Sequence, residues 1–178
     1  MDKAIVLLSS YNGAEYIGAQ IESIISQSYD NWELIIRDDN SGDDTVDIIK
    51  DYCRMDSRIH LVSDDKGNLG YPACFYELTD TAPDAEYYFF ADQDDVWFPD
   101  KIERAIRMLS ALTGNRPAAY YGGYTICDEN LASIRTATPN HPAGSHINHN
   151  ILYLLLFFVY LDILVPIQSI IRIFETSA

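Results

Sequence analysis

Phe89-Phe90-Ala91-Asp92-Gln93-Asp94-Asp95-Val96-Trp97 is the stretch around which the rest of the chain is arranged. It places three carboxylates in four residues at the end of an apolar run, and Pro99 follows it. Because Asp92 and Asp94 lie two positions apart, a bend at a strand end can turn both toward one cation. Mg²⁺ or Mn²⁺ would take oxygen ligands from these carboxylates and from a diphosphate. The alternative is a solvated acidic turn in which Asp95 caps the next helix.

On both sides of this stretch, short apolar or β-rich runs alternate with segments of helical periodicity. The expected strands are 4–8, 32–36, 59–62, 87–91 and 118–124, and the expected helices are 14–28, 45–55, 72–81 and about 102–112. Residues 125–131 are expected to form a turn or hairpin. Strands that alternate with helices in this order favour right-handed crossovers. The predicted fold class is α/β, a mainly parallel sheet flanked by helices.

Four polar loops follow the expected strands, at residues 9–13, 38–45, 64–70 and 92–95. The carboxyl ends of parallel strands meet at one edge of a sheet, and open α/β sheets bind their ligands there. The loops therefore predict one shared site.

Two of these loops offer groups suited to a nucleotide. A carboxylate at Asp38 or Asp39 is suited to accept a hydrogen bond from a base N–H or a ribose hydroxyl, with helix capping as the alternative. Tyr11 is suited to stack on a base, with ordinary packing as the alternative. The chain has neither a Walker sequence nor G-x-G-x-x-G, so a P-loop or dinucleotide site is excluded.

Composition narrows the classes of function further. The formal net charge of -15 argues against binding nucleic acid through its phosphates. Three scattered cysteines fit thiols in a reducing compartment better than disulfides or a zinc site. His141, His146 and His149 lie in a Pro- and Asn-bearing segment and are interpreted as a solvated loop, with a metal site as the alternative. The apolar run after Lys3 is too short for a signal peptide, which predicts a cytoplasmic protein.

The chain divides into three expected parts: a domain at 1–135, a linker at 136–150 and an apolar tail at 151–178. The uninterrupted apolar part of the tail is shorter than the roughly 20 residues that span a bilayer. An interfacial or buried segment is therefore favoured over a transmembrane helix, and peripheral contact with the inner face of the membrane is an open alternative. Another open alternative is that the tail is the scrambled end of a truncated or frameshifted reading frame.

Taken together, these motifs resemble the family 2 glycosyltransferases of GT-A fold, in particular their rhamnosyltransferase-like bacterial branch. The resemblance covers roughly residues 3–130. The matching residues are 8–13 with Tyr16-Ile17, Gln20 to Ile24, Gln27-Ser28-Tyr29, 32–36, 37–41 with 43–45, Asn68-Leu69-Gly70, 92–97 and 99–101. So many motifs in one order make the resemblance specific.

The resemblance implies transfer of a sugar, with inversion, from a nucleoside diphosphate to the hydroxyl of a saccharide or lipid-linked acceptor, in the building of a surface polysaccharide. By motif position, the residues implied to bind the donor nucleotide are Ser9, Tyr11, Asp38, Asp39 and Asp92. Asp94 is implied as the principal ligand of Mg²⁺ or Mn²⁺, with Asp92 beside it.

An inverting transfer also needs a general base, and the resemblance does not supply one. In the family this carboxylate lies in the acceptor half, whereas this chain departs from the pattern after about residue 150. Asp128 and Glu129 lie too early to be assigned the role. A truncated or non-catalytic nucleotide-sugar-binding module is therefore an open alternative. A receiver-like signalling domain whose aspartates bind Mg²⁺ is disfavoured, because the carboxylate pairs lie within the sugar-transferase motifs.

Overall fold

The computed structural model describes residues 1–111, 118–122, 124–128, 133–137 and 163–164. Within those ranges the helices are α1 (Ile17–Ile25), α2 (Thr45–Met55), α3 (Ala73–Thr81) and α4 (Lys101–Ser110). The strands are β1 (Ala4–Ser10), β2 (Trp32–Asp38), β3 (Ile59–Leu61), β4 (Tyr87–Ala91), β5 (Tyr120–Tyr121), β6 (Tyr124–Cys127), β7 (Ser133–Ala137) and β8 (Ile163–Leu164). This order confirms the predicted alternation of strands and helices.

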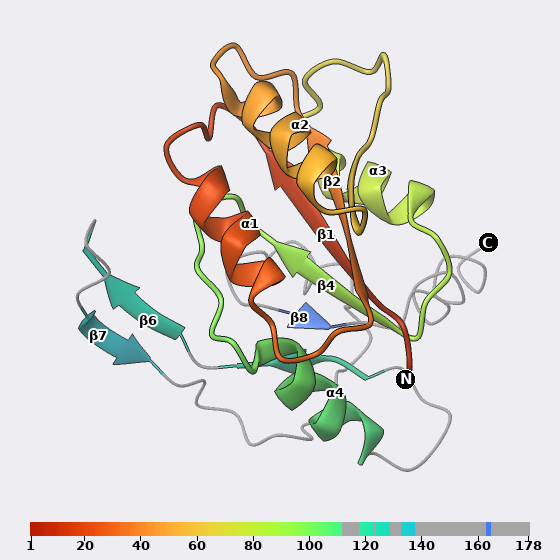
Figure 1. The fold of residues 1–178 in the computed structure, drawn as a ribbon, viewed down its shortest axis with the longest axis vertical. Helices are drawn as coiled ribbons and strands as arrows, with labels where there is room; N and C mark the ends of the chain where they lie inside the picture. The colour runs from red at the N-terminus through yellow and green to blue at the C-terminus, as the bar shows by residue number, and fades with distance from the viewer. Residues whose placement is uncertain (112–117, 123, 129–132, 138–162, 165–178) are drawn as a thin grey trace.

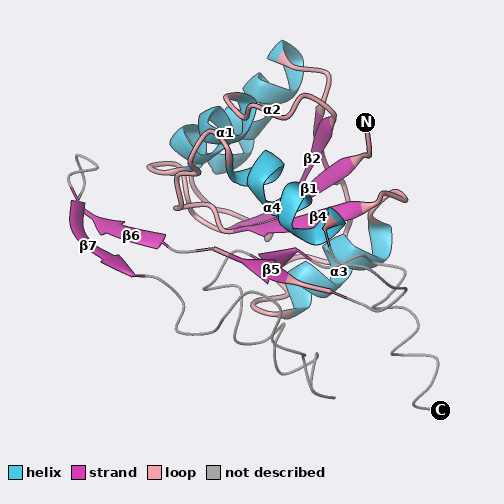
Figure 2. Ribbon diagram, turned by 90° about the horizontal axis from the view of Figure 1, so that it is seen from below, coloured by secondary structure: helices cyan, strands magenta, loops and turns pink. Residues whose placement is uncertain are grey.

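The described strands form a main sheet in the order β3-β2-β1-β4-β8-β5, and β6 pairs with β7 in a separate hairpin. The four strands β3, β2, β1 and β4 run parallel, as predicted. Strand β8 is antiparallel to both of its neighbours, β4 and β5. Figure 1 shows the β6–β7 hairpin standing apart from the main sheet, and Figure 2 gives the same separation from below.

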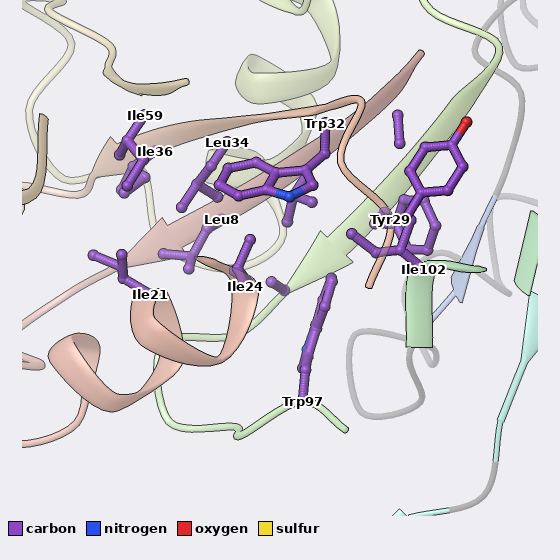
Figure 3. Close-up of a cluster of buried hydrophobic side chains, with 14 of the residues drawn as sticks. Leu8, Ile21, Ile24, Tyr29, Trp32, Leu34, Ile36, Ile59, Trp97 and Ile102 are labelled. Carbon is purple, nitrogen blue, oxygen red and sulfur yellow. The ribbon is translucent and has the colours of Figure 1, made fainter. Parts of the chain in front are cut away.

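Helices cover the parallel sheet on both faces, because its strands are apolar on both sides. Residues Ala4, Val6 and Leu8 of β1 pack in one cluster with α1, α2 and α4. The alternate residues Ile5 and Leu7 pack in a second cluster with α3. Figure 3 shows the first cluster, in which isoleucines of α1 lie against leucines and isoleucines of the strands. The sheet thus lies between two clusters of buried side chains, and its strand ends carry the polar loops.

Some predicted bounds differ from the structure. The helix expected at 14–28 begins only at Ile17, because the carbonyl of Gly13 accepts hydrogen bonds from the main-chain N–H groups of Tyr16 and Ile17 in a preceding turn. The single strand expected at 118–124 is instead β5 and β6, separated at Gly122. Helix α4 begins after Asp100, so Asp95 is not its cap.

The three-part division of the chain is only partly within the described residues. Strand β7 reaches Ala137, two residues into the expected linker, and His141, His146 and His149 lie outside the described residues. Of the expected apolar tail, the structure describes only Ile163–Leu164, which joins the main sheet as β8. No helix among the described residues is long and apolar enough to cross a membrane.

Candidate functional site at the carboxyl edge of the sheet

The strand ends that carry the predicted residues lie side by side in register. Ser10, the last residue of β1, pairs with Asp38, the last residue of β2. On the other side of β1, Leu8 pairs with Ala91, the last residue of β4. One position beyond that pair come Ser9 and Asp92. The predicted nucleotide residues and the acidic loop therefore start from the same edge of three adjacent strands.

Gln93 joins the loop after β1 to the acidic loop after β4. Its side-chain Oε1 accepts a hydrogen bond from the main-chain N–H of Tyr11 at 2.8 Å. Its Nε2 donates to the carbonyl of the same residue at 3.1 Å. This two-point contact fixes Asp92 and Asp94, on either side of Gln93, relative to the Tyr11 loop. Sequence analysis missed this residue because it considered only the carboxylates of the acidic stretch.

Gly13 makes room for this contact, since a Cβ at Gly13 would overlap the amide group of Gln93. Gly13→Ala is therefore expected to displace the amide and lower the free energy of unfolding by about 1–3 kcal/mol, as overpacked sites do. Urea unfolding of Gly13→Ala, Gln93→Ala and the double variant measures this. In the Gln93→Ala background, Gly13→Ala should cost clearly less. Equal costs in both backgrounds would show that the amide is not what the glycine accommodates.

The loops after β1 and β2 are tied together by a second set of hydrogen bonds. The main-chain N–H of Asn12 donates to Ser41 Oγ at 2.8 Å, and the side chain of Asn12 accepts from the N–H of Gly42 at 2.8 Å. The N–H of Gly13 donates to Thr45 Oγ1, the first residue of α2, at 2.8 Å. Asn12 has a φ of 48°, which an asparagine in a tight turn adopts more readily than most residues.

The loop between β3 and α3 is held by an ion network centred on the buried Arg37. Arg37, 1% exposed, pairs with the carboxylates of Asp39 and Asp64. Its Nε lies 2.9 Å from Asp64 Oδ2, and its Nη2 donates to the carbonyl of Gly67 at 2.9 Å. Asp39 in turn accepts from the main-chain N–H groups of Leu69 and Gly70 at 2.8 and 2.7 Å. All four predicted loops thus meet at one edge and are hydrogen bonded to one another.

This network shifts the ionisation of its members. Burial by itself raises the pKa of Asp39, but hydrogen bonds from Leu69, Arg37 and Gly70 outweigh it and hold that pKa below the ordinary 3.8. The hydrogen bond from Arg37 lowers the pKa of Asp64 in the same way. Burial by itself lowers the pKa of Arg37, but hydrogen bonds to Asp64 and Asp39 outweigh it and raise that pKa above its ordinary value. All three groups are therefore charged at neutral pH.

Because the pKa values of Asp39 and Asp64 are lower in the folded chain, their stabilisation is complete well above pH 4. It is lost as the pH falls through the folded values. Asp64→Asn is thus expected to be less stable than wild type at pH 7, with a difference that shrinks toward pH 3. Asp65→Asn, at an exposed neighbour, is the control and should follow wild type. Urea unfolding from pH 7 to pH 3 measures the free energy of unfolding of all three proteins. A difference between Asp64→Asn and wild type that does not change with pH would show that the charge of Asp64 does not stabilise the fold.

The predicted donor residues differ in their surroundings. Ser9 is half-buried beside Cys74, a buried thiol whose pKa is raised by burial. Tyr11 is 50% exposed, which leaves its ring available for stacking. Asp38 accepts hydrogen bonds from the hydroxyls of Ser10 and Ser41. Asp39, 3% exposed, is the most enclosed of the set.

The acidic loop is suited to a cation that is only partly held by protein. Asp92 is half-buried, and Asp94 is exposed. Within the part of the chain that the structure describes, no group of three or more His, Cys, Asp or Glu side chains is placed to hold a metal ion. Mg²⁺ and Mn²⁺ fit such a donor set when diphosphate oxygens complete their coordination, because they are commonly bound by one or two carboxylates plus substrate phosphates. The residues present are therefore compatible with the expected cation.

Two curated proteins with similar sequences are glycosyltransferases. The chain is 36% identical over 104 residues to TuaG of Bacillus subtilis, a glycosyltransferase named for teichuronic acid biosynthesis. It is 32% identical over 127 residues to WfgD of Escherichia coli, a UDP-Glc:alpha-D-GlcNAc-diphosphoundecaprenol beta-1,3-glucosyltransferase. These alignments cover 58% and 70% of this chain but only 40% and 47% of the relatives. The chain thus spans less than half of their length.

Solved structures give the same fold. Staphylococcus aureus TarS in complex with UDP-GlcNAc matches 61% of this chain, and 31% of its own, with a TM-score of 0.54 and 25% identity. The mannosyltransferase PcManGT from Pyrobaculum calidifontis, in complex with GDP-Man and Mn²⁺, matches 60% of this chain and 32% of its own with a TM-score of 0.54 at 20% identity. These matches confirm the predicted GT-A fold.

The family model described as glycosyl transferase family 2 matches residues 5–169. That range covers β1 except its first residue, β2 to β4, all four loops of the carboxyl edge, and β8. It includes nearly all of the residues that carry the resemblance and extends beyond them to residue 169. The chain therefore belongs to glycosyl transferase family 2.

Proposed function

We propose that this chain binds a nucleoside-diphosphate sugar at the carboxyl edge of its sheet and transfers the sugar, with inversion, to an acceptor hydroxyl in a metal-dependent reaction. The observation that carries the proposal is the hydrogen-bonded meeting of the four loops at that edge. The acidic loop and the predicted nucleotide residues share it. A receiver-like signalling domain is disfavoured by the family membership.

In this proposal the loop after β1 and the end of β2 bind the nucleoside. The half-exposed ring of Tyr11 stacks on the base, and the hydroxyl of Ser9 lies near it. Asp38 and Asp39 receive hydrogen bonds from the base and ribose. Asp39 already accepts three hydrogen bonds from this chain, from Arg37, Leu69 and Gly70, so its position is set before the donor binds. Preorganisation of this kind lowers the entropic cost of binding.

The acidic loop is proposed to bind the diphosphate end of the donor. Asp94 and Asp92 would hold Mg²⁺ or Mn²⁺ between the protein and the diphosphate oxygens. When bound, such a cation acts as a Lewis acid that stabilises the negative charge of the departing nucleoside diphosphate. Gln93 keeps both carboxylates at a fixed place relative to Tyr11, and so to the nucleoside.

The acceptor is proposed to be a saccharide or a lipid-linked saccharide, in the synthesis of a surface polysaccharide. The names of TuaG and WfgD support this proposal, because one names teichuronic acid biosynthesis and the other a diphosphoundecaprenol-linked acceptor. The base that accepts the acceptor's proton is not assigned. A location in the cytoplasm, with peripheral contact at the membrane through residues 151–178, fits such an acceptor.

Calorimetry with UDP, dTDP and GDP, each with and without Mn²⁺, tests the proposal. At least one nucleoside diphosphate should bind, and Mn²⁺ should strengthen its binding. Absence of binding by all three would overturn the proposal. Transfer is then assayed as release of the nucleoside diphosphate from its sugar in the presence of a saccharide acceptor. Metal-dependent binding without transfer would select the alternative, a non-catalytic nucleotide-sugar-binding module.

A further inference from the structure

One face of α1 is polar although it is buried. Gln20, Ser23 and Gln27 recur at spacings of three and four residues along α1 and just past its end, and they are 0%, 8% and 6% exposed. A helix face that packs against a core is normally apolar. Buried polar side chains cost stability unless each finds hydrogen-bond partners. The partners of these three side chains therefore show what the face contacts.

Ser23 and Gln27 both bind the main chain of the segment that follows the acidic loop. Ser23 Oγ accepts a hydrogen bond from the N–H of Trp97 at 3.0 Å. Gln27 Nε2 donates to the carbonyl of Phe98 at 2.8 Å, and its Oε1 accepts from the N–H of Ile102 at 3.0 Å. These contacts join positions that are more than 70 residues apart in the sequence.

Gln20 extends the same contact toward the acidic residues. Its amide lies between the indole N–H of Trp97, which can only donate, and the carbonyl of Asp95, which can only accept. The amide oxygen therefore faces Trp97 Nε1, at 3.2 Å, and the amide nitrogen faces Asp95 and Ser23 Oγ. The Ser23 hydroxyl then donates to the main-chain carbonyl of Gln20 at 2.7 Å. It accepts from the main-chain N–H of Trp97 and from the side-chain amide nitrogen of Gln20. Each side-chain nitrogen and oxygen of Gln20, Ser23, Gln27 and Trp97 thus has a hydrogen-bond partner.

The acidic loop is thus fixed from both sides. Gln93 is bound to the main chain of Tyr11 on one side of Asp94. Asp95, Trp97 and the residues after them are bound to α1 on the other. Figure 3 shows Trp97 beside α1, near Ile24, and its ring centroid lies 5.9 Å from that of Phe89 in β4. Asp94 is therefore an exposed residue on a loop that is held by hydrogen bonds on both sides of it.

We infer that Gln20, Ser23 and Gln27 are positioning residues, which hold the acidic loop and the three residues after it in the conformation that presents Asp94 to a cation and a nucleoside diphosphate. This inference rests on the proposed function for the identity of the ligand. They act through the main chain of Asp95, Trp97 and Phe98 and touch neither ligand themselves. A hydrophobic α1 face could not bind these main-chain groups, because apolar side chains neither donate nor accept hydrogen bonds.

Ser23→Ala tests the inference with a small change, since it leaves the Trp97 N–H without its acceptor. Ser26→Ala is the matched control, because the exposed Ser26 hydroxyl binds only within its own helix, to the Glu22 carbonyl at 2.8 Å. Ile24→Val controls for lost stability, since Ile24 is buried on the apolar face of α1. If Ser23→Ala does not fold, Gln20→Met takes its place. Each folded variant is compared by two measurements: calorimetry with UDP, or GDP if UDP does not bind, with and without Mn²⁺, and amide hydrogen exchange.

Ser23→Ala is expected to weaken Mn²⁺-dependent nucleotide binding about tenfold or more, because loss of a residue that orients a metal ligand typically has an effect of this size. Exchange of the 93–98 amides should become faster. Both controls should bind like wild type, although Ile24→Val unfolds more easily. If Ser23→Ala binds like wild type with Mn²⁺, or if Ile24→Val weakens binding as much, the positioning role is wrong. If wild type binds no nucleoside diphosphate, the proposed function is wrong, whatever the variants do. If the 93–98 amides of Ser23→Ala exchange at the wild-type rate, Ser23 does not hold the loop, whatever the binding results.

Discussion

Asp94→Ala is expected to lower Mn²⁺-dependent affinity for a nucleoside diphosphate by more than about 100-fold. Loss of a residue that merely hydrogen bonds to a metal ligand already costs about 10–100-fold in metal affinity, and loss of a ligand itself should cost more. The free energy of unfolding should stay within about 0.5 kcal/mol of wild type, because Asp94 is an exposed residue. The combination is diagnostic. A carboxylate that serves only as a solvated turn residue would change neither quantity.

Asp84→Asn provides the matched control for Asp94→Ala. Asp84 is an exposed carboxylate a few residues before β4, whereas Asp94 follows that strand's carboxyl end. Its removal changes the net charge of the chain equally but leaves the proposed site intact. Calorimetry with and without Mn²⁺ should therefore give wild-type affinity for Asp84→Asn. Weaker binding in both variants would point to a general electrostatic effect, and wild-type binding in Asp94→Ala would place the cation elsewhere.

Arg37→Met is expected to be the most destabilising single substitution proposed for this chain, with a loss of roughly 3–5 kcal/mol. The side chain of Arg37 is 1% exposed, and that of its partner Asp39 is 4% exposed. The substitution removes the cation and leaves the carboxylate of Asp39 buried without it. A loss of this size is a large part of the ~5–15 kcal/mol that stabilises a typical domain.

Arg58→Met is the control for Arg37→Met, because Arg58 lies just before β3, at the amino ends of the parallel strands. Arg58 pairs with Asp56 at 2.7 Å and lies 3.8 Å above the ring of Trp32, but its side chain is 34% exposed. Arg58→Met is therefore expected to cost only ~1 kcal/mol. Urea unfolding at pH 7 compares the two variants. Asp39→Asn should recover part of the loss in Arg37→Met. Equal losses for Arg37→Met and Arg58→Met would contradict the buried-charge argument.

The sheet and its loops were predictable because each element is marked locally. Runs such as 4–8 and 87–91 are apolar on both faces, and the loops after them carry Asn, Asp and Gly. The rule that parallel strand ends meet at one edge then brings the loops together without knowledge of any contact. The family resemblance rested on the same loops, and the family match confirms it.

The parts that sequence analysis missed depend on long-range hydrogen bonds. Helical periodicity counts apolar positions, so the polar partners of Gln20 and Gln27, which come from a segment some 70 residues later, leave no local signal. Arg37 was quoted only as part of a motif, although its burial makes it the centre of an ion network. Strand β8 has two residues within a long apolar stretch, which contains nothing to mark its pairing with β4.

Paramagnetic Mn²⁺, added with UDP to isotope-labelled protein, tests the location of the donor site most directly by NMR. If the donor binds as proposed, amide signals of the loops 9–13, 38–45 and 92–95 will broaden first, because these loops share the carboxyl edge of the sheet. Signals at the opposite edge, such as those of 30–32 and 84–87, should stay sharp. Asp94→Ala should abolish the selective broadening. Broadening centred on the opposite edge or on the β6–β7 hairpin, with sharp signals in the three loops, would show that the donor does not bind at the carboxyl edge.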